Sequence, residues 1–176
     1  MRKLTMEELN RLSKDQYEGV PKLPVVIVLD NIRSLSNVGA VFRSADAFRI
    51  EELFLCGITA CPPHREIHKT ALGADETVRW RYFSTTEEAC QELKTMGYGI
   101  YAVEQVDDSV MLQDFCTPPR TAFILGNEVD GVSDSALPYC DGAVEIPQEG
   151  TKHSLNVSVC SGIIMWHSFK QLFLKK

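Results

Sequence analysis

The stretch FILGNEVDGVS, Phe123–Ser133, decides how this chain folds. Its apolar run, Phe123–Leu125, has the composition of a buried strand and stops at Gly126. The Gly-Asn-Glu sequence that follows places backbone amides and a carboxylate at the carboxyl end of that strand. Open α/β sheets bind their ligands at this edge. The stretch therefore predicts a strand that leads into a ligand-binding loop.

A second stretch, EIPQEGTKHSLNVSV at Glu145–Val159, repeats this design. Ala143–Ile146 is predicted as a strand, Pro147–His153 as a loop, and Ser154 as the cap of a last helix over Leu155–Leu174. Two such loops in tandem indicate one ligand that is held mainly by backbone groups.

The rest of the chain alternates predicted strands with predicted helices. Six strands are expected, at Val25–Leu29, Glu52–Cys56, Thr77–Phe83, Tyr98–Val103, Thr121–Leu125 and Ala143–Ile146. This alternation predicts an α/β fold: a mostly parallel six-stranded sheet with helices on both faces. The pattern alone predicts no knot, since knots are nearly absent among proteins. One domain is expected over residues 24–176, after a short N-terminal helix and linker at residues 1–23.

Capping patterns predict where the other helices start. Thr5 and Glu8 form a capping box for a helix over Met6–Lys14, and Gln16–Pro24 is predicted as a linker. A second helix is expected to start at a cap at Ser36 or Asn37 and to extend to Phe48. A third follows the capping box of Ser84 and Glu87 and ends at Gly97.

Composition and charge limit the class of protein. The chain has 44% hydrophobic and 24% charged residues, as ordinary globular proteins do. No apolar run has the length of a membrane span, and the polar start does not resemble a signal peptide. We therefore expect a cytoplasmic protein that contacts no membrane, with its six cysteines reduced. The net charge of −6 disfavours binding to RNA, whose phosphates are negative. The distribution of charge matters more than the total, and the first half of the chain carries basic residues that could contact RNA: Arg33, Arg43, Arg49, Arg65, Lys69, Arg79 and Arg81.

Three groups of residues, in fixed order, carry a family resemblance. The first contains Asn37, Gly39 and Arg43. The second and third groups are Gly126, Asn127, Glu128 and Gly131, then Ile146, Pro147, Gly150, Ser154, Leu155 and Asn156. With these groups the chain resembles the SpoU/TrmH family of RNA ribose methyltransferases, roughly from Val25 to Phe169. A single short match would mean little, but the ordered set is specific.

The resemblance implies a deep trefoil knot that begins near Pro119, with the second and third groups as its loops. It implies S-adenosylmethionine as cofactor and a homodimer that places the first group of one subunit near the cofactor of the other. It assigns the adenosine pocket to Val103, Leu125, Gly126, Ile146 and Leu155. Arg49 and Cys160 depart from the family pattern, and neither is expected to touch the motif residues. A compact member suggests tRNA as substrate, with ribosomal RNA second.

The resemblance treats Arg43 as catalytic, with Asn37 beside it. Arg43 either removes the hydroxyl proton with the help of a phosphate or clamps that phosphate, and we favour the clamp because a guanidinium stays protonated. Glu128 could stabilise the sulfonium, hold Arg43 or bind loop amides. Ser154 and Asn156 could contact substrate or cofactor. Ser154 could equally be only a helix cap, an explanation that suits Asn156 less well.

Other interpretations remain. Cys56, Cys61, His64 and His68 have a spacing loosely like that of a zinc site, but two prolines intervene and we expect no metal. A catalytically silent protein that binds cofactor or RNA would share the fold, although the intact candidate residues argue against it. An α/β nucleotide-binding enzyme of other chemistry lacks support, since no glycine loop for phosphates is present.

The last helix also predicts assembly. It carries an apolar stripe: Leu155, Val159, Ile163, Trp166, Phe169 and Leu172. Little sequence follows to cover its final turns. An exposed apolar patch of this kind is typical of an interface, so we expect a homodimer.

Overall fold

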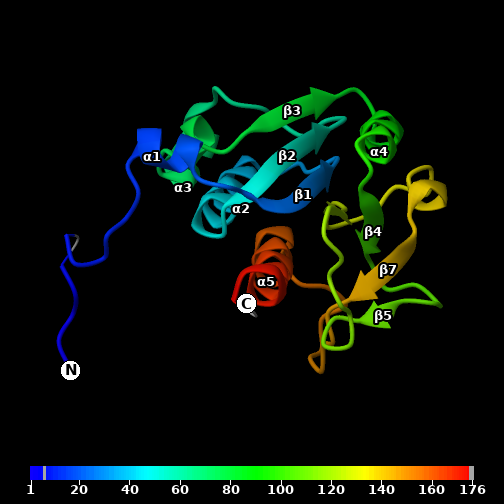
Figure 1. Cartoon of the computed structure of the whole chain (residues 1–176). Coiled ribbons are helices and arrows are strands. Elements are labelled where there is room, and N and C mark those ends of the chain that lie inside the picture. The colour runs from blue at the N-terminus through cyan, green and yellow to red at the C-terminus, as the bar shows by residue number, and fades with distance from the viewer. Residues whose placement is uncertain (6, 175–176) are drawn as a thin grey trace.

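The structure, a computed structural model, describes residues 1–5 and 7–174 and is built on one sheet in the order β3-β2-β1-β6-β4-β7-β5 (Figure 1). The strands are β1 Leu23–Asp30, β2 Ile50–Cys56, β3 Trp80–Phe83, β4 Gly99–Val103, β5 Val110–Met111, β6 Thr121–Leu125 and β7 Gly142–Glu145. All six pairings are parallel, as predicted. The predicted number of strands is wrong by one. The exposed two-residue β5 at the edge is too short to produce an apolar run in the sequence.

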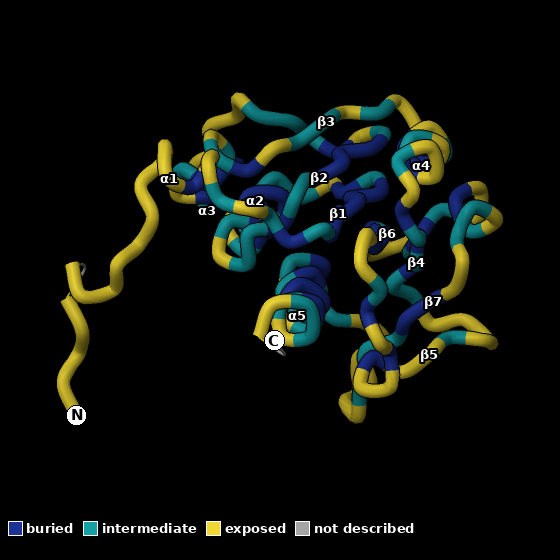
Figure 2. The backbone as a smooth tube through the Cα atoms, in the orientation of Figure 1, coloured by how far each residue is buried: buried dark blue, intermediate teal, exposed yellow. Residues whose placement is uncertain are grey.

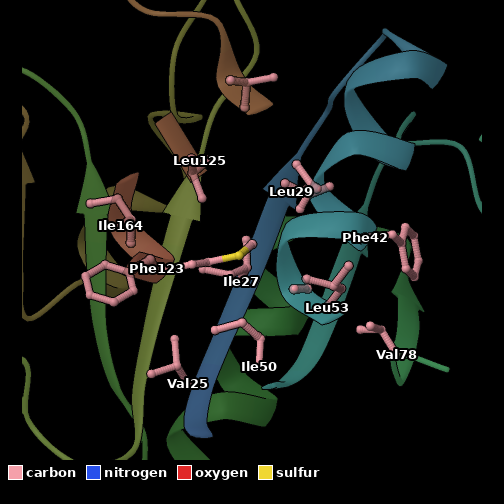
Figure 3. Packing of buried hydrophobic residues seen from close by; sticks show 14 of the residues in the cluster. Val25, Ile27, Leu29, Phe42, Ile50, Leu53, Val78, Phe123, Leu125 and Ile164 are labelled. Carbon is pink, nitrogen blue, oxygen red and sulfur yellow. The ribbon is translucent and has the colours of Figure 1, made fainter. Parts of the chain in front are cut away.

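Helices cover both faces of the sheet, as predicted (Figure 1). The elements are α1 Lys14–Gly19, α2 Leu35–Ala47, α3 Arg65–Ala71, α4 Thr86–Thr95 and α5 Val157–Phe169, with short helical turns at Ala74–Glu76, Leu137–Tyr139 and Lys170–Leu174. Val25, Ile27 and Leu29 of β1 belong to a core cluster with residues of α2, α3 and α5 (Figure 3). Val26 and Val28 point to the other face and pack with α4. β1 therefore contributes alternate side chains to two cores, as expected for an interior strand of a sheet that is covered on both faces.

The helix predicted over Met6–Lys14 is wrong for the residues described; Met6 itself lies outside them. The capping box of Thr5 and Glu8 forms both of its hydrogen bonds, at 2.8 and 3.3 Å. Residues 7–10 nevertheless form only a turn, because Asn10 adopts a left-handed conformation with φ of +46°. A correct local cap therefore does not suffice when no apolar face packs against the core.

Helix α1 instead lies inside the segment predicted as a linker. It begins after a second capping box, formed by Ser13 and Gln16, and buries one side chain, Tyr17. Residues 1–5 and 7–13, before α1, are exposed and extend away from the body of the molecule (Figure 2). In the described part of the chain, no helix combines the length and apolar character needed to cross a membrane.

Candidate functional site

A cavity of about 360 Å³ lies at the carboxyl ends of β4, β6 and β7. Its volume falls in the range of small-molecule sites. The structure brings all five residues of the predicted adenosine pocket to its wall: Val103, Leu125, Gly126, Ile146 and Leu155. Glu128 and Ser154 also line the cavity. These residues come from three strand ends, which parallel pairing places along the same edge of the sheet.

The first wall of the cavity is the loop of residues 126–133, called here the first loop. The loop turns back on itself through a backbone bridge between Asn127 and Gly131. The Asn127 side-chain oxygen accepts hydrogen bonds from the amides of Val129 and Asp130, at 2.9 and 3.0 Å. A Cβ atom on Gly126 would overlap the carbonyl group of Gly131. Glycine is therefore needed at position 126 because two backbone segments cross there, rather than because a ligand needs the space.

Glu104, directly after β4, binds the backbone of the first loop and was not singled out from the sequence. Its Oε2 atom accepts a hydrogen bond from the Val132 amide at 3.0 Å. Gly131 has a φ of +69°, and a Cβ atom there would overlap the Glu104 carboxylate. The only signal in the sequence was an acidic side chain at the end of an apolar strand.

Gln105 connects β4 to residues 146–156, called here the second loop. Its side-chain amide donates a hydrogen bond to the His153 carbonyl oxygen at 3.3 Å. The end of β4 thus contacts both loops that enclose the cavity.

Asp30 fixes the far end of the first loop. This carboxylate at the end of β1 is fully buried. It accepts hydrogen bonds from the Thr86 hydroxyl at 2.6 Å, the Ser133 amide at 2.7 Å and the Asn31 side chain at 2.8 Å. Three donors compensate for the cost of burying the carboxylate. Asp30 lies outside the cavity, so its position supports the loop rather than the ligand.

Three side chains from the three sequence groups meet beside the cavity. Asn37 donates a hydrogen bond to Glu128 Oε1 at 2.6 Å and accepts one from Asn156 at 3.2 Å. Helix α2 starts earlier than predicted, because Ser34 is its cap and accepts a hydrogen bond from the Asn37 amide at 3.3 Å. The prediction of a cap at Ser36 or Asn37 is therefore wrong. Since Ser34 caps the helix, the Asn37 side chain is free to face the loops.

The predicted cap of the last helix is also wrong. Asn156, not Ser154, caps α5: its side-chain oxygen accepts a hydrogen bond from the Ser158 amide at 2.9 Å. Ser154 lies two residues before the cap, on the cavity wall. The sequence favours a cap at Ser154 over one at Asn156, and the structure shows the reverse. Asn156 also donates a hydrogen bond from its amide nitrogen to Asn37.

Arg43 is the one predicted site residue that the structure leaves apart from the others. It is exposed and does not line the cavity. It follows Asn37 by six residues on α2, which corresponds to about 9 Å along a helix axis. Within residues 1–5 and 7–174, the Arg43 side chain makes no ion pair. Its guanidinium therefore remains available for a group outside this chain.

Cys160 lines the cavity, which corrects the expectation that it would not touch the motif residues. It lies in the first turn of α5, and its amide donates to the Asn156 carbonyl oxygen at 2.9 Å. Burial, with a smaller contribution from Glu104, raises the pKa of the thiol to about 12. Cys160 is therefore a neutral, apolar part of the wall at physiological pH.

Comparison with known proteins gives a family for this arrangement. The model of the SpoU rRNA Methylase family matches residues 24–166. The 23S rRNA (guanosine-2'-O-)-methyltransferase RlmB of Neisseria meningitidis is 31% identical over 163 residues, which are 92% of this chain and 64% of that enzyme. The tRNA (guanosine(18)-2'-O)-methyltransferase of Thermus thermophilus is 30% identical over 171 residues, which are 97% of this chain and 86% of that enzyme.

The fold is similar to that of a solved structure as well. The TrmH/SpoU tRNA modifying enzyme of A. aeolicus matches with a TM-score of 0.79 and 25% identity, covering 88% of this chain and 78% of that one. The chain spans less than two thirds of the length of some curated relatives: 64% of the Neisseria enzyme and 60% of its Nitrosomonas europaea counterpart.

Proposed function

Because this chain belongs to the SpoU rRNA methylase family, we propose that it is an RNA methyltransferase that uses S-adenosylmethionine to methylate a ribose 2'-hydroxyl. The observation that carries the proposal is the cavity at the carboxyl ends of β4, β6 and β7, with the Asn37–Glu128–Asn156 network beside it. The cavity offers a pocket for a cofactor, and the network beside it offers polar side chains for the methyl acceptor.

The cavity wall suits S-adenosylmethionine. Leu125, Ile146 and Leu155 supply apolar surface for an adenine ring, and the two loops supply backbone amides and carbonyl groups for polar atoms. The cofactor supplies an electrophilic methyl group on a positively charged sulfur. Glu128 lies on the wall, and its carboxylate complements that charge. Asn37 restrains Glu128 through the 2.6 Å hydrogen bond, which fixes the carboxylate before any ligand arrives.

Arg43 acts on the acceptor side in this proposal. Its exposed guanidinium would bind the phosphate next to the target ribose with two parallel hydrogen bonds and stabilise the negative charge that develops on the oxygen. We favour this role over proton removal because a guanidinium stays protonated at neutral pH. Ser154 on the cavity wall and Asn156, which bonds Asn37, would help to position the ribose.

A homodimer explains how Arg43 can take part. Asn37 bonds Glu128 on the wall of its own chain's cavity, while Arg43 lies about 9 Å further along the same helix. Helices α2 and α5 contact each other, and α5 exposes Val159 and Trp166 by 52% and 47%. We propose that this surface pairs with a second copy, so that Arg43 of one subunit serves the cavity of the other.

We further propose that the family's trefoil knot is formed, with residues 24–176 as the methyltransferase domain. The sheet order supports threading: β6 lies between β1 and β4, and the chain then passes through β7 before α5 returns to pack on α2 and β1. The family match that starts at residue 24 supports the domain boundary. Cytoplasmic localisation remains a prediction from the sequence.

For the substrate we propose tRNA, with 23S rRNA as the alternative, and guanosine as the target nucleotide, since both named relatives act on guanosine. The test is incubation of the purified protein with labelled S-adenosylmethionine and RNA that lacks ribose methyl groups, followed by mapping of the modified nucleotide. Methylation of a 2'-hydroxyl is expected. A protein that binds S-adenosylhomocysteine but methylates neither RNA would instead support a silent binding protein.

A further inference from the structure

The short segment Glu104–Gln105, at the end of β4, contacts both loops that enclose the cavity. Glu104 accepts the Val132 amide of the first loop, and Gln105 donates to the His153 carbonyl oxygen of the second. The Glu104 Oε1 atom also accepts the Gln105 amide at 3.0 Å, so the two residues are fixed relative to each other. The Glu104 amide in turn bonds the Val144 carbonyl oxygen of β7, at 3.2 Å.

The packing around Glu104 is unusually close. Gly126 leaves room for the backbone of Gly131, and Gly131 leaves room for the Glu104 carboxylate. The strand end, the returning loop and the carboxylate therefore form three layers, and the two contacts between them require glycine at positions 126 and 131. A carboxylate held in this way cannot move without moving the first loop.

We infer that Glu104 is a positioning residue for cofactor binding, which holds the first loop in its binding conformation while Gln105 links it to the second loop. The inference rests on the proposed function, because it takes the cavity as the S-adenosylmethionine site. It assigns to β4 a task that neither sequence group at the loops performs. Glu104 lines the cavity and also holds the loop backbone through the Val132 amide. Its loss should therefore change cofactor affinity rather than the rate at saturating cofactor.

The test compares wild type with Glu104→Gln. The Val132 and Gln105 amides bond different oxygens of the Glu104 carboxylate. Glutamine has nearly the same shape but replaces one of these oxygens with an NH2 donor, so one of the two amides loses its acceptor. Glu51→Gln is the control: it makes the same chemical change at a carboxylate that accepts a hydrogen bond from the Tyr98 hydroxyl at 2.6 Å and lies outside the cavity.

Two measurements are made on each protein. The first is hydrogen–deuterium exchange in the ligand-free protein, with α4 as internal reference. Glu104→Gln should accelerate exchange in residues 126–133 and leave α4 unchanged. The second is calorimetry with S-adenosylhomocysteine, where Glu104→Gln should raise the dissociation constant about tenfold, the usual effect of losing a hydrogen bond to a charged group. Methylation rates measured over a range of S-adenosylmethionine concentrations should give the wild-type kcat and a raised KM for S-adenosylmethionine.

The outcomes separate the inference from the proposed function. Unchanged exchange in residues 126–133 of Glu104→Gln would overturn the inference whatever the cofactor is. Faster exchange with unchanged affinity for S-adenosylhomocysteine would also overturn it. A lowered kcat without a raised KM would show that Glu104 acts on the reaction itself, against the inference. Failure of the wild type to bind S-adenosylhomocysteine would refute the proposed cofactor, while the exchange measurement would still decide whether Glu104 holds the loop.

Discussion

Arg43 is an exposed motif residue that does not line the cavity, and this location defines a test. Arg43→Ala should lower methyl transfer by roughly 10²–10³, because a charged contact made in the transition state is lost. Affinity for S-adenosylhomocysteine should stay within a few fold, since Arg43 does not line the cavity. Single-turnover rates and calorimetry measure the two effects. Arg79→Ala, an exposed arginine just before β3, is the control. Near-normal turnover by Arg43→Ala would contradict the assigned role.

Gly126 and Gly150 form a matched pair of loop glycines. A Cβ atom at Gly126 would overlap the Gly131 backbone, whereas a Cβ atom at Gly150 would meet no atom within 4 Å. Gly126→Ala should therefore displace the first loop and weaken binding of S-adenosylhomocysteine at least tenfold, while Gly150→Ala should leave binding unchanged. Calorimetry measures affinity, and thermal unfolding shows whether each variant folds. Equal affinities for the two variants would place the ligand elsewhere.

Cys160 yields a prediction about pH. Alkylating reagents react with the thiolate, and burial, assisted by Glu104, raises the pKa of Cys160 to about 12. Iodoacetamide at pH 8 should modify the exposed Cys116 readily and Cys160 very slowly. The rate at Cys160 should keep rising with pH up to the onset of unfolding, because the thiolate fraction is far from saturation. Peptide mass spectrometry measures both sites. Comparable rates at pH 8 would show that the Cys160 thiol does not have the raised pKa.

At the scale of elements, the start of α2 joins the two loops through Asn37. Because Asn37 bonds both Glu128 and Asn156, these residues should act as one unit. Asn37→Ala should lower kcat, and adding Glu128→Gln to it should cost less than the sum of the single effects. A double-mutant cycle on methylation rates measures this coupling. Strictly additive effects would mean that the hydrogen bond between Asn37 and Glu128 does not contribute to the reaction.

At the scale of the whole molecule, the α2–α5 surface is the expected dimer interface. Trp166 contacts Phe48 and Phe169 within its own chain, with ring centroids 6.0 and 6.1 Å apart, yet remains 47% exposed. The core-facing side of α5 is formed by other residues: Val157, Ser161, Ile164, Met165 and Ser168. Trp166 is therefore not needed to fill the core, and a polar replacement should leave the fold intact.

Trp166→Asp should accordingly produce folded monomers that do not methylate RNA. Light scattering measures the mass, and circular dichroism shows whether the fold is kept. Tyr82→Asp, which changes an exposed aromatic residue on the edge strand β3, should remain dimeric. A wild-type protein that is monomeric at micromolar concentration and fully active would refute the dimer. It would also refute the proposal that Arg43 of one subunit acts at the cavity of the other.

The sequence by itself determined the parallel α/β sheet and the positions of the two loops. The physical reason is that these features are local. Apolar runs such as Phe123–Leu125 form buried strands wherever a sheet is available, and parallel pairing then aligns their carboxyl ends. The family resemblance added the assignment of residues within those loops, and all five predicted pocket residues line the cavity.

Only the tertiary structure decided which polar groups meet. Asn37 is 91 residues from Glu128 and 119 from Asn156, and Asp30 is 103 residues from the amide that it binds at Ser133. No local propensity specifies such partners, because they depend on how loops pack after the sheet has formed. The caps predicted at Ser36 or Asn37 and at Ser154 were misplaced for the same reason: several neighbouring side chains could cap each helix, and packing selected Ser34 and Asn156. Glu104 supports the first loop because β4 and β6 are adjacent in the folded sheet, a neighbourhood that exists only in three dimensions.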